Sequence, residues 1–274
     1  MKSLKTEVAV IGAGTAGMAA YRRVVAHGRS ALLIEGGPYG TTCARVGCMP
    51  SKLLIAAADA AHQVRQAALF GVFADAPRID GAAVMRRVRA ERDRFVDFVQ
   101  QAVRSWPAEQ RLQGNASFVA PGRLVVDERV LVETERIVIA TGSSPSVPEE
   151  WRAALGDRLV VTDDVFEWTT LPASLAVVGA GAIGLELAQA LARLGVRVRL
   201  FGRGARVAAL SDPAVNAEAL KLIAEEVPYE PDAQIHAVAR AGDGVEVDYQ
   251  AGERRLRERF DLLLAATGRR PNLA

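Results

Sequence analysis

The chain has 274 residues, of which 50% are hydrophobic and 24% are charged, and its 34 Lys and Arg residues nearly balance its 32 Asp and Glu residues. A chain of this length can bury a sizeable core in two domains or in one large α/β domain. The balanced charge gives no reason to expect a nucleic-acid partner, and no apolar run reaches the ~18 residues of a membrane span. We therefore expect a cytoplasmic protein that binds neither nucleic acid nor membrane.

A strand, a glycine turn and a helix are predicted near the start of the chain. The stretch "VAVIGAGTAG" (residues 8–17) leads a β-branched apolar run into the pattern G-x-G-x-x-G, and an Ala-rich helical pattern and a second apolar run, "SALLIE", follow. Strand, glycine turn, helix and strand within ~30 residues are typical of a dinucleotide-binding unit. The glycines expected to approach the pyrophosphate are Gly12, Gly14 and Gly17.

The acidic residue that ends the second apolar run predicts which dinucleotide binds to this unit. Glu35 lies 23 residues beyond Gly12. A carboxylate at that position can accept hydrogen bonds from the hydroxyl groups of the adenosine ribose. It would repel a 2′-phosphate, so we expect a dinucleotide with a free 2′-hydroxyl group, such as FAD.

Both cysteines of the chain, Cys43 and Cys48, lie in the stretch "GTTCARVGCMPSK" (residues 40–52). Chance clustering, a structural disulfide, half of a metal site and a redox pair are the alternatives. A structural zinc site normally needs four ligands, and none of the three histidines (His27, His62 and His236) stands at ligand spacing from the cysteines. We favour a redox pair and expect no metal, because cytosolic cysteine pairs are more often catalytic or redox-sensing than structural.

A helix is predicted to begin near the second cysteine. Residues five apart on a regular helix have Cα atoms ~8–9 Å apart, whereas a disulfide usually needs less than ~7 Å. We therefore expect the helix to be distorted between the cysteines, and Gly47 and Pro50 are well placed to distort it.

The next stretches are predicted to be structural. Residues 80–106 place apolar side chains at helical spacing and arginines mostly on the other face, which favours a surface helix over a nucleic-acid site. Short alternating runs between residues 115 and 135 predict a small antiparallel β insert. The buried-strand pattern "RIVIATG" then ends at Thr141 and Gly142, where backbone can pass close to a bound cofactor.

A domain boundary is predicted in "SSPSVPEE" (residues 143–150), because this stretch is rich in proline and serine. We therefore expect two Rossmann-like α/β domains, in which helices flank a doubly wound sheet. The first would cover residues 1–146 and bind FAD, and the second would cover residues 147–274 and bind NAD(P).

The glycine pattern recurs in the second half as "LAVVGAGAIG" (residues 175–184), again followed by a helical pattern and an apolar run. The residue 23 positions beyond Gly179 is Gly202, and Arg203 follows it. Glycine leaves room for a 2′-phosphate, and a guanidinium can bind one, so we expect NADPH. If the arginines are only solvated loop charges, NADH remains possible. The expected cofactor contacts are Gly179, Gly181, Ile183, Gly184, Arg203, Arg206 and, after the strand "LLLAATG", Gly268.

Together these motifs resemble the flavin-dependent pyridine nucleotide–disulfide oxidoreductases, the family of dihydrolipoamide dehydrogenase, glutathione reductase and mercuric reductase. The resemblance covers essentially the whole chain and rests on C-x4-C-x-P-S-K after the first glycine motif, with "GAGAIGLELA" and "ATGRRPN" further on. It implies that Cys48 faces the flavin as the charge-transfer thiol and that Cys43 exchanges with the substrate. It also implies that Lys52 lies near the flavin, paired with Glu186, and that backbone near Thr42, Ala116 and Gly142 lines FAD.

The resemblance implies further parts that this sequence does not contain. In the family an interface domain follows the "ATGRRPN" segment, forms a homodimer and supplies a His/Glu pair as acid and base, so we expect a shortened chain. Thr41 also replaces a glycine of the family pattern, which could alter the turn over the flavin pyrophosphate. The expected acceptor is a small-molecule or protein-bound disulfide or another thiol-reactive compound. The alternative is a noncatalytic module that binds FAD and NAD(P).

Overall fold

The computed structural model describes residues 1–204 and 206–273, which form two compact units. The first unit comprises Met1–Arg45, Arg92–Ser144 and Pro271–Ala274, and the second comprises Val46–Glu91 and Pro145–Arg270. The change of unit between Ser144 and Pro145 lies within the proline- and serine-rich link. Residues 46–91 belong by their packing to the second unit, although they precede that link.

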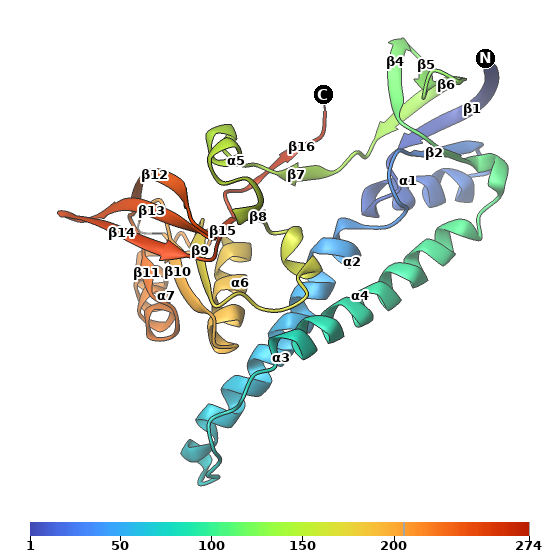
Figure 1. Cartoon of the computed structure of the whole chain (residues 1–274). Helices are drawn as coiled ribbons and strands as arrows, with labels where there is room; N and C mark the ends of the chain where they lie inside the picture. Colours follow the sequence, from blue (N-terminus) through green and yellow to red (C-terminus); the bar gives the residue numbers. More distant parts are fainter. Residues whose placement is uncertain (205, 274) are drawn as a thin grey trace. The chain divides into compact units, whose positions relative to one another are not determined.

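The first unit is built on a six-stranded sheet with the order β3-β2-β1-β6-β5-β4 (Figure 1). The strands β1, β2, β3 and β6 are parallel, and β5 and β4 are antiparallel to their neighbours. Their bounds are β1 (Lys2–Ile11), β2 (Ala31–Glu35), β3 (Arg111–Gln113), β4 (Ala116–Ala120), β5 (Arg123–Val126) and β6 (Val130–Ile139). The expected antiparallel insert is therefore part of the main sheet, because the ten-residue β6 pairs with β1 on one side and with β5 on the other.

The two faces of this sheet carry separate cores because successive residues of a strand face opposite sides. On one face, Val10 and Leu33 pack with Met18 and Tyr21 of α1 (Thr15–Ala26) and with Val103 of α4 (Gly81–Arg104). The other face is packed by strands rather than helices, and its buried residues are Ala9, Leu32, Ile34, Leu124, Val126 and Val132. The first glycine turn follows β1, at the edge where the parallel strands end.

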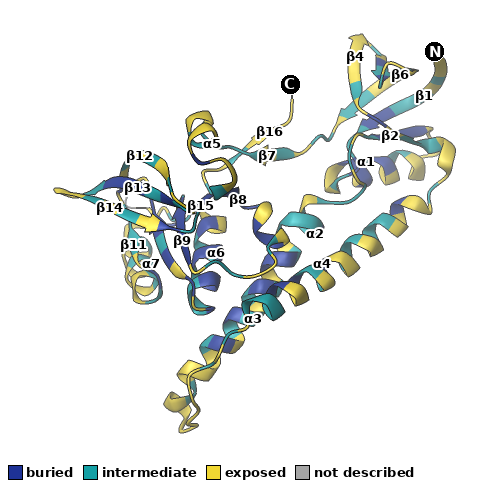
Figure 2. Cartoon of the chain, viewed as in Figure 1, coloured by how far each residue is buried: buried dark blue, intermediate teal, exposed yellow. Residues whose placement is uncertain are grey.

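The second unit is layered around a five-stranded parallel sheet with the order β11-β10-β9-β15-β8. An antiparallel sheet, β12-β13-β14, packs on one face, and Figure 2 shows the buried strands of the parallel sheet. The strands are β8 (Leu159–Val161), β9 (Ser174–Val178), β10 (Arg197–Phe201), β11 (Tyr229–Glu230), β12 (Gln234–Ala241), β13 (Gly244–Ala251), β14 (Arg254–Phe260) and β15 (Leu262–Ala265). The charged stretch near residue 254 forms the antiparallel β13–β14 pair.

Helices cover the other face of the parallel sheet. Leu187 and Leu191 of α6 (Ala182–Arg193) share a buried core with Leu54 of α3 (Cys48–Gln66) and Met85 of α4. This shared core explains why residues 46–91 join the second unit. The other α-helices are α2 (Thr42–Val46), α5 (Glu149–Leu155) and α7 (Pro213–Glu226). Short 3-10 turns span Ala67–Phe70, Ala108–Gln110, Gly156–Arg158 and Asp164–Glu167. Two short strands, β7 (Ser143–Pro145) and β16 (Arg269–Pro271), pair with each other.

None of the helices within the described residues combines the length and the apolar character that a bilayer crossing requires.

Candidate functional site

The first glycine turn connects β1 to α1, and its backbone requires glycine at two of three positions. Gly12 has a φ of 104°, and its N–H donates to the Ile34 carbonyl at 2.7 Å. A Cβ on Gly12 would lie 2.2 Å from the carbonyl oxygen of Ala140, and a Cβ on Gly17 would lie 1.8 Å from the oxygen of Gly12. The first and third glycines are therefore required by the backbone itself, whatever the turn binds.

The middle glycine of this turn is different because its open side faces no protein atom. A Cβ on Gly14 would meet nothing within 4 Å. Gly14 is also the N-cap of α1, and no side chain caps this helix end, whose first turn carries no acidic residue. Unpaired N–H groups and the positive end of the helix dipole favour an anion here, so the turn fits a dinucleotide pyrophosphate.

The second glycine turn, between β9 and α6, repeats this arrangement. Gly179 has a φ of 115°, its N–H donates to the Phe201 carbonyl at 2.8 Å, and its Cβ would lie 2.3 Å from the Ala266 oxygen. A Cβ on Gly184 would lie 1.9 Å from the Gly179 oxygen, whereas one on Gly181 would meet nothing within 4 Å. Gly181 is the N-cap of α6, again without a side-chain cap.

The start of α7, unlike the starts of α1 and α6, is capped by a side chain. The carboxylate of Asp212 accepts hydrogen bonds from the N–H groups of Ala214 and Val215 at 2.9 and 3.0 Å, and Pro213 occupies the first helical position. Side-chain capping of this kind is worth about 1 kcal/mol. Its absence from α1 and α6 leaves their terminal N–H groups available at both glycine turns.

The position after the second strand differs between the two turns. In the first unit, Glu35 accepts hydrogen bonds from the N–H of Ala13 at 2.6 Å and from the N–H of Gly37 at 2.8 Å. The carboxylate is therefore held at the glycine turn, where its remaining lone pairs can accept hydrogen bonds from ribose hydroxyl groups.

In the second unit, strand register places Gly202 at the position of Glu35, because Ile34 pairs with Ile11 and Phe201 pairs with Val178. The space beside Gly202 is already filled: its Cβ would lie 2.6 Å from the hydroxyl oxygen of Tyr229 and 2.8 Å from the carbonyl oxygen of Pro231. The sequence predicts free space for a 2′-phosphate beside Gly202, but the Cβ side of this residue is filled.

The two arginines that follow Gly202 are exposed. Arg203 forms an isolated antiparallel bridge with Asp232 through its backbone. Among the described residues, no carboxylate lies within ion-pair distance of the Arg203 or Arg206 guanidinium. Both side chains are therefore available to an anionic group.

The cysteines lie on two successive helices that are separated by Gly47. Cys43 is on α2 and is half-buried, whereas Cys48 is the first residue of α3 and is exposed. Gly47 has φ −131° and ψ −120°, outside the helical region, so it provides the expected distortion. Pro50 contributes no break, because it lies in the first turn of α3, where the missing N–H has no intrahelical partner to lose.

Thr41, the residue that departs from the family pattern, caps the first of these helices. Its hydroxyl oxygen accepts a hydrogen bond from the N–H of Ala44 at 2.9 Å, and its carbonyl accepts one from Arg45 at 3.1 Å. The substitution therefore fixes the start of the helix that carries Cys43.

The contact expected between Lys52 and Glu186 is present within the second unit. The Lys52 ammonium donates to Oε1 of Glu186, and the hydroxyl of Ser51 lies 2.8 Å from the same oxygen. The Ser51 hydroxyl also lies 3.2 Å from the carbonyl oxygen of Cys48. These contacts tie the start of α3, which begins at Cys48, to the second turn of α6, the helix that follows the second glycine turn.

The Thr141–Gly142 segment is held by Asn272, for which the sequence pattern predicts no role. The N–H of Asn272 donates to the Gly142 carbonyl at 3.0 Å, and its side-chain amide donates to the Thr141 carbonyl at 3.1 Å. Gly142 has a φ of 71°. Asn272 was visible in "ATGRRPN", but neither spacing nor composition indicated that it folds back onto the end of β6.

The other expected cofactor residues lie at the ends of elements. Thr42 begins α2 and Ala116 begins β4. Ile183, in the first turn of α6, is 47% exposed. Gly268 has a φ of 105°, and its carbonyl accepts a hydrogen bond from Ser146 at 2.9 Å.

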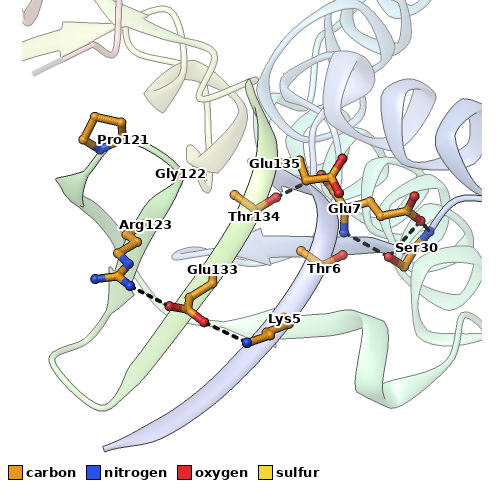
Figure 3. A pocket seen from close by; sticks show the side chains of 10 residues that line it. All are labelled: Lys5, Thr6, Glu7, Ser30, Pro121, Gly122, Arg123, Glu133, Thr134 and Glu135. Atoms are coloured by element: carbon orange, nitrogen blue, oxygen red, sulfur yellow. Dashed lines mark hydrogen bonds and ion pairs between the residues drawn. The ribbon is translucent and has the colours of Figure 1, made fainter.

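A pocket of about 520 Å³ in the first unit is separate from all of these residues (Figure 3). Three of its charged side chains pair with one another: Glu133 contacts Lys5 at 3.5 Å and Arg123 at 3.0 Å. Glu7, which also lines it, is paired with Arg29 at 2.5 Å. Since these groups satisfy each other, the pocket does not compete with the glycine turns as a candidate site. Within the described part of the chain, no group of three or more His, Cys, Asp or Glu side chains is placed to hold a metal ion.

Comparison with known proteins identifies the family. Residues 6–274 match the profile of the pyridine nucleotide-disulphide oxidoreductases. The chain belongs to this family. It is 35% identical to a mercuric reductase of Streptomyces lividans, over 96% of this chain and 56% of that protein. It is 37% identical to a mercuric reductase of Shigella flexneri, over 97% of this chain and 48% of that protein.

A dihydrolipoyl dehydrogenase of Bacillus subtilis is 30% identical, over 97% of this chain and 58% of that protein. The chain therefore spans about half the length of these curated family members. Among solved structures, the HOCl-induced flavoprotein disulfide reductase RclA of Escherichia coli, as a Cu(II) complex of a cysteine-to-serine variant, superposes with a TM-score of 0.80 and 21% identity. That match covers 99% of this chain and 58% of the RclA chain and shows that the fold is shared.

Proposed function

We propose that this chain is the nucleotide- and thiol-bearing part of a flavin-dependent disulfide oxidoreductase. The first glycine turn binds FAD, the second binds NADPH, and Cys43 and Cys48 pass the electrons to an acceptor. The observation that carries this proposal is the pair of glycine turns, each with an uncapped helix N-terminus and a middle glycine open to a ligand. Family membership supports the assignment of a flavin to one turn and a pyridine nucleotide to the other.

Each cofactor would be held mainly by backbone. The N–H groups after Gly14 and Gly181 would bind the two pyrophosphates, and Glu35 would accept hydrogen bonds from the FAD ribose. The other residues proposed to contact FAD are Gly12, Gly17, Thr42, Lys52, Ala116, Thr141 and Gly142. Those proposed to contact the pyridine nucleotide, or to line the path of its nicotinamide ring to the flavin, are Gly179, Ile183, Gly184, Glu186, Arg203, Arg206 and Gly268. When bound, the flavin would supply two-electron exchange between the nicotinamide and the thiols.

The thiol chemistry balances without a metal ion. A Cys43–Cys48 disulfide takes up two electrons and two protons to give two thiols. The thiolate of Cys43 then attacks the acceptor disulfide, which forms a mixed disulfide and releases one acceptor thiol. The thiolate of Cys48 attacks Cys43, which restores the Cys43–Cys48 disulfide and releases the second acceptor thiol.

The preference for NADPH over NADH is supported by two features of the second turn. Gly202 puts no carboxylate where one would repel a 2′-phosphate, and Arg203 and Arg206 present exposed guanidinium groups nearby in the sequence. The acceptor is a disulfide or another thiol-reactive compound. The names of the relatives, mercuric reductase and dihydrolipoyl dehydrogenase, indicate that mercuric ion and a lipoyl disulfide are the acceptors to test first.

Absorbance spectroscopy of the purified protein with FAD tests the proposal. We expect a bound-flavin spectrum and, after reduction by NADPH, a long-wavelength charge-transfer band. Cys48→Ala should abolish this band because it removes the thiol proposed to face the flavin. Cys43→Ala, the matched control, should retain it. A protein that takes up neither FAD nor NADPH would contradict the proposal, and one that binds both without any thiol-dependent band would be a noncatalytic module.

A further inference from the structure

The hydroxyl group of Tyr229 is buried without a partner beside the position that discriminates between nucleotides. Its oxygen has no hydrogen-bond partner among the described residues and is closed to solvent. Burial also raises the pKa of this phenol above its ordinary value, so the group is neutral. A buried hydroxyl that makes no hydrogen bond lowers the stability of the fold, so the presence of Tyr229 at this position needs an explanation.

Strand pairing brings this hydroxyl to Gly202. Tyr229, on β11, pairs with Leu200 of β10, two residues before Gly202. Residues 200 and 202 face the same side of the sheet because side chains alternate along a strand. The ring of Tyr229 packs against the core that contains Leu200, so its hydroxyl end extends along the strand to the space beside Gly202.

The same space in the first unit is occupied by a carboxylate side chain. Glu35 begins there and reaches the N–H of Ala13 in the glycine turn. In the second unit a Cβ at position 202 would already lie 2.6 Å from the Tyr229 hydroxyl and 3.1 Å from its ring. Any side chain at position 202 therefore has to displace the tyrosine as well as relieve the contact with the Pro231 carbonyl.

We propose that Tyr229 is a specificity-determining residue of the second nucleotide site: it occupies the space from which a carboxylate would recognise a 2′-hydroxyl group and so keeps residue 202 a glycine. This proposal rests on the proposed function, in that the second turn must bind a pyridine nucleotide. With no carboxylate at position 202, the charged side chains left for the adenosine ribose are the guanidinium groups of Arg203 and Arg206, which match a 2′-phosphate.

Thermal unfolding tests whether Tyr229 excludes a side chain. Gly202→Ala should lower the melting temperature by about 5 °C, because one methyl group overpacks the site. Gly181→Ala is the matched control, since its Cβ meets nothing within 4 Å, and it should melt close to the wild type. In a Tyr229→Ala background the additional loss from Gly202→Ala should be smaller. Equal losses in both backgrounds, or no loss in Gly202→Ala, would overturn the proposal.

Binding of 2′,5′-ADP and 5′-AMP, which differ only in the 2′-phosphate, tests the consequence for specificity when it is measured by calorimetry. The wild type should bind 2′,5′-ADP at least about tenfold more tightly, the value of one charge-assisted hydrogen bond. Gly202→Glu alone should be destabilised without acquiring a preference for 5′-AMP, whereas Gly202→Glu with Tyr229→Ala should prefer 5′-AMP.

The outcomes separate this proposal from the proposed function. A wild type that binds neither probe would overturn the proposed function, and the role of Tyr229 with it. A wild type that prefers 2′,5′-ADP, together with a Gly202→Glu variant that melts like the wild type and prefers 5′-AMP, would overturn the role of Tyr229 alone.

Discussion

The two glycine turns have the same backbone arrangement, but the residue after the second strand differs between them. The Cβ positions of Gly12 and Gly179 lie 2.2 and 2.3 Å from the carbonyls of equivalent strands, and those of Gly17 and Gly184 lie 1.8 and 1.9 Å from equivalent oxygens. After the second strand, however, the first unit has the Glu35 carboxylate and the second has a glycine. The comparison teaches that backbone packing fixes the pyrophosphate site, whereas the ribose site is set by side chains.

We expect the largest loss of stability when a methyl group is added to the third glycine of either turn. Gly17→Ala and Gly184→Ala each place a Cβ less than 2 Å from a backbone oxygen. Neither turn can yield without moving its helix, so each variant should lose about 3 kcal/mol or more of unfolding free energy. Urea unfolding of the two variants measures the loss. Stability within about 0.5 kcal/mol of the wild type would show that these turns do not pack as described.

The helix that follows the second turn is anchored by ion pairs at its far end. Arg193, the last residue of α6, pairs with Glu226 of α7 at 2.5 Å and with Asp59 of α3 at 2.7 Å. Hydrogen bonds from Arg193 hold the pKa of Glu226 below its ordinary value. His62 also faces this carboxylate, at 3.9 Å.

This anchoring predicts a small pH effect on stability. Because the folded-state pKa of Glu226 is lowered, its contribution is fully present above the ordinary carboxyl pKa and is lost as pH falls through the lowered value. Glu226→Gln should therefore cost about 1 kcal/mol or less at neutral pH, and the cost should vanish in acid. Unfolding curves of both proteins between neutral and strongly acidic pH measure the difference. A cost that persists unchanged in acid would assign it to packing rather than to the ion pair.

Much of the site could be predicted from sequence because its geometry is local. Residues close together in the sequence determine the glycine turns, the acidic residue that ends β2 and the break at Gly47. Local sequence patterns can therefore predict these features. The Lys52–Glu186 pair came from the family resemblance, since no spacing rule joins residues so far apart.

The remaining features depend on tertiary packing, which no local pattern encodes. Tyr229 lies in the stretch "VPYEPD", which carries no binding motif, and only the pairing of β10 with β11 brings it to Gly202. In the same way, the helical pattern of α3 predicts a helix but not that its buried face joins the core of the second unit. The antiparallel strands were expected, but their continuity with the parallel sheet depends on the length of β6.

We propose that the two open glycines, Gly14 and Gly181, belong to the binding sites of two different dinucleotides. Crossed binding measurements on Gly14→Ala and Gly181→Ala test it most directly, because both substitutions enter open space and leave the fold intact. We predict that Gly14→Ala weakens FAD binding at least about tenfold with 2′,5′-ADP binding unchanged, and that Gly181→Ala does the reverse. Equal weakening of both ligands by either variant, or of neither ligand by both, would contradict the account.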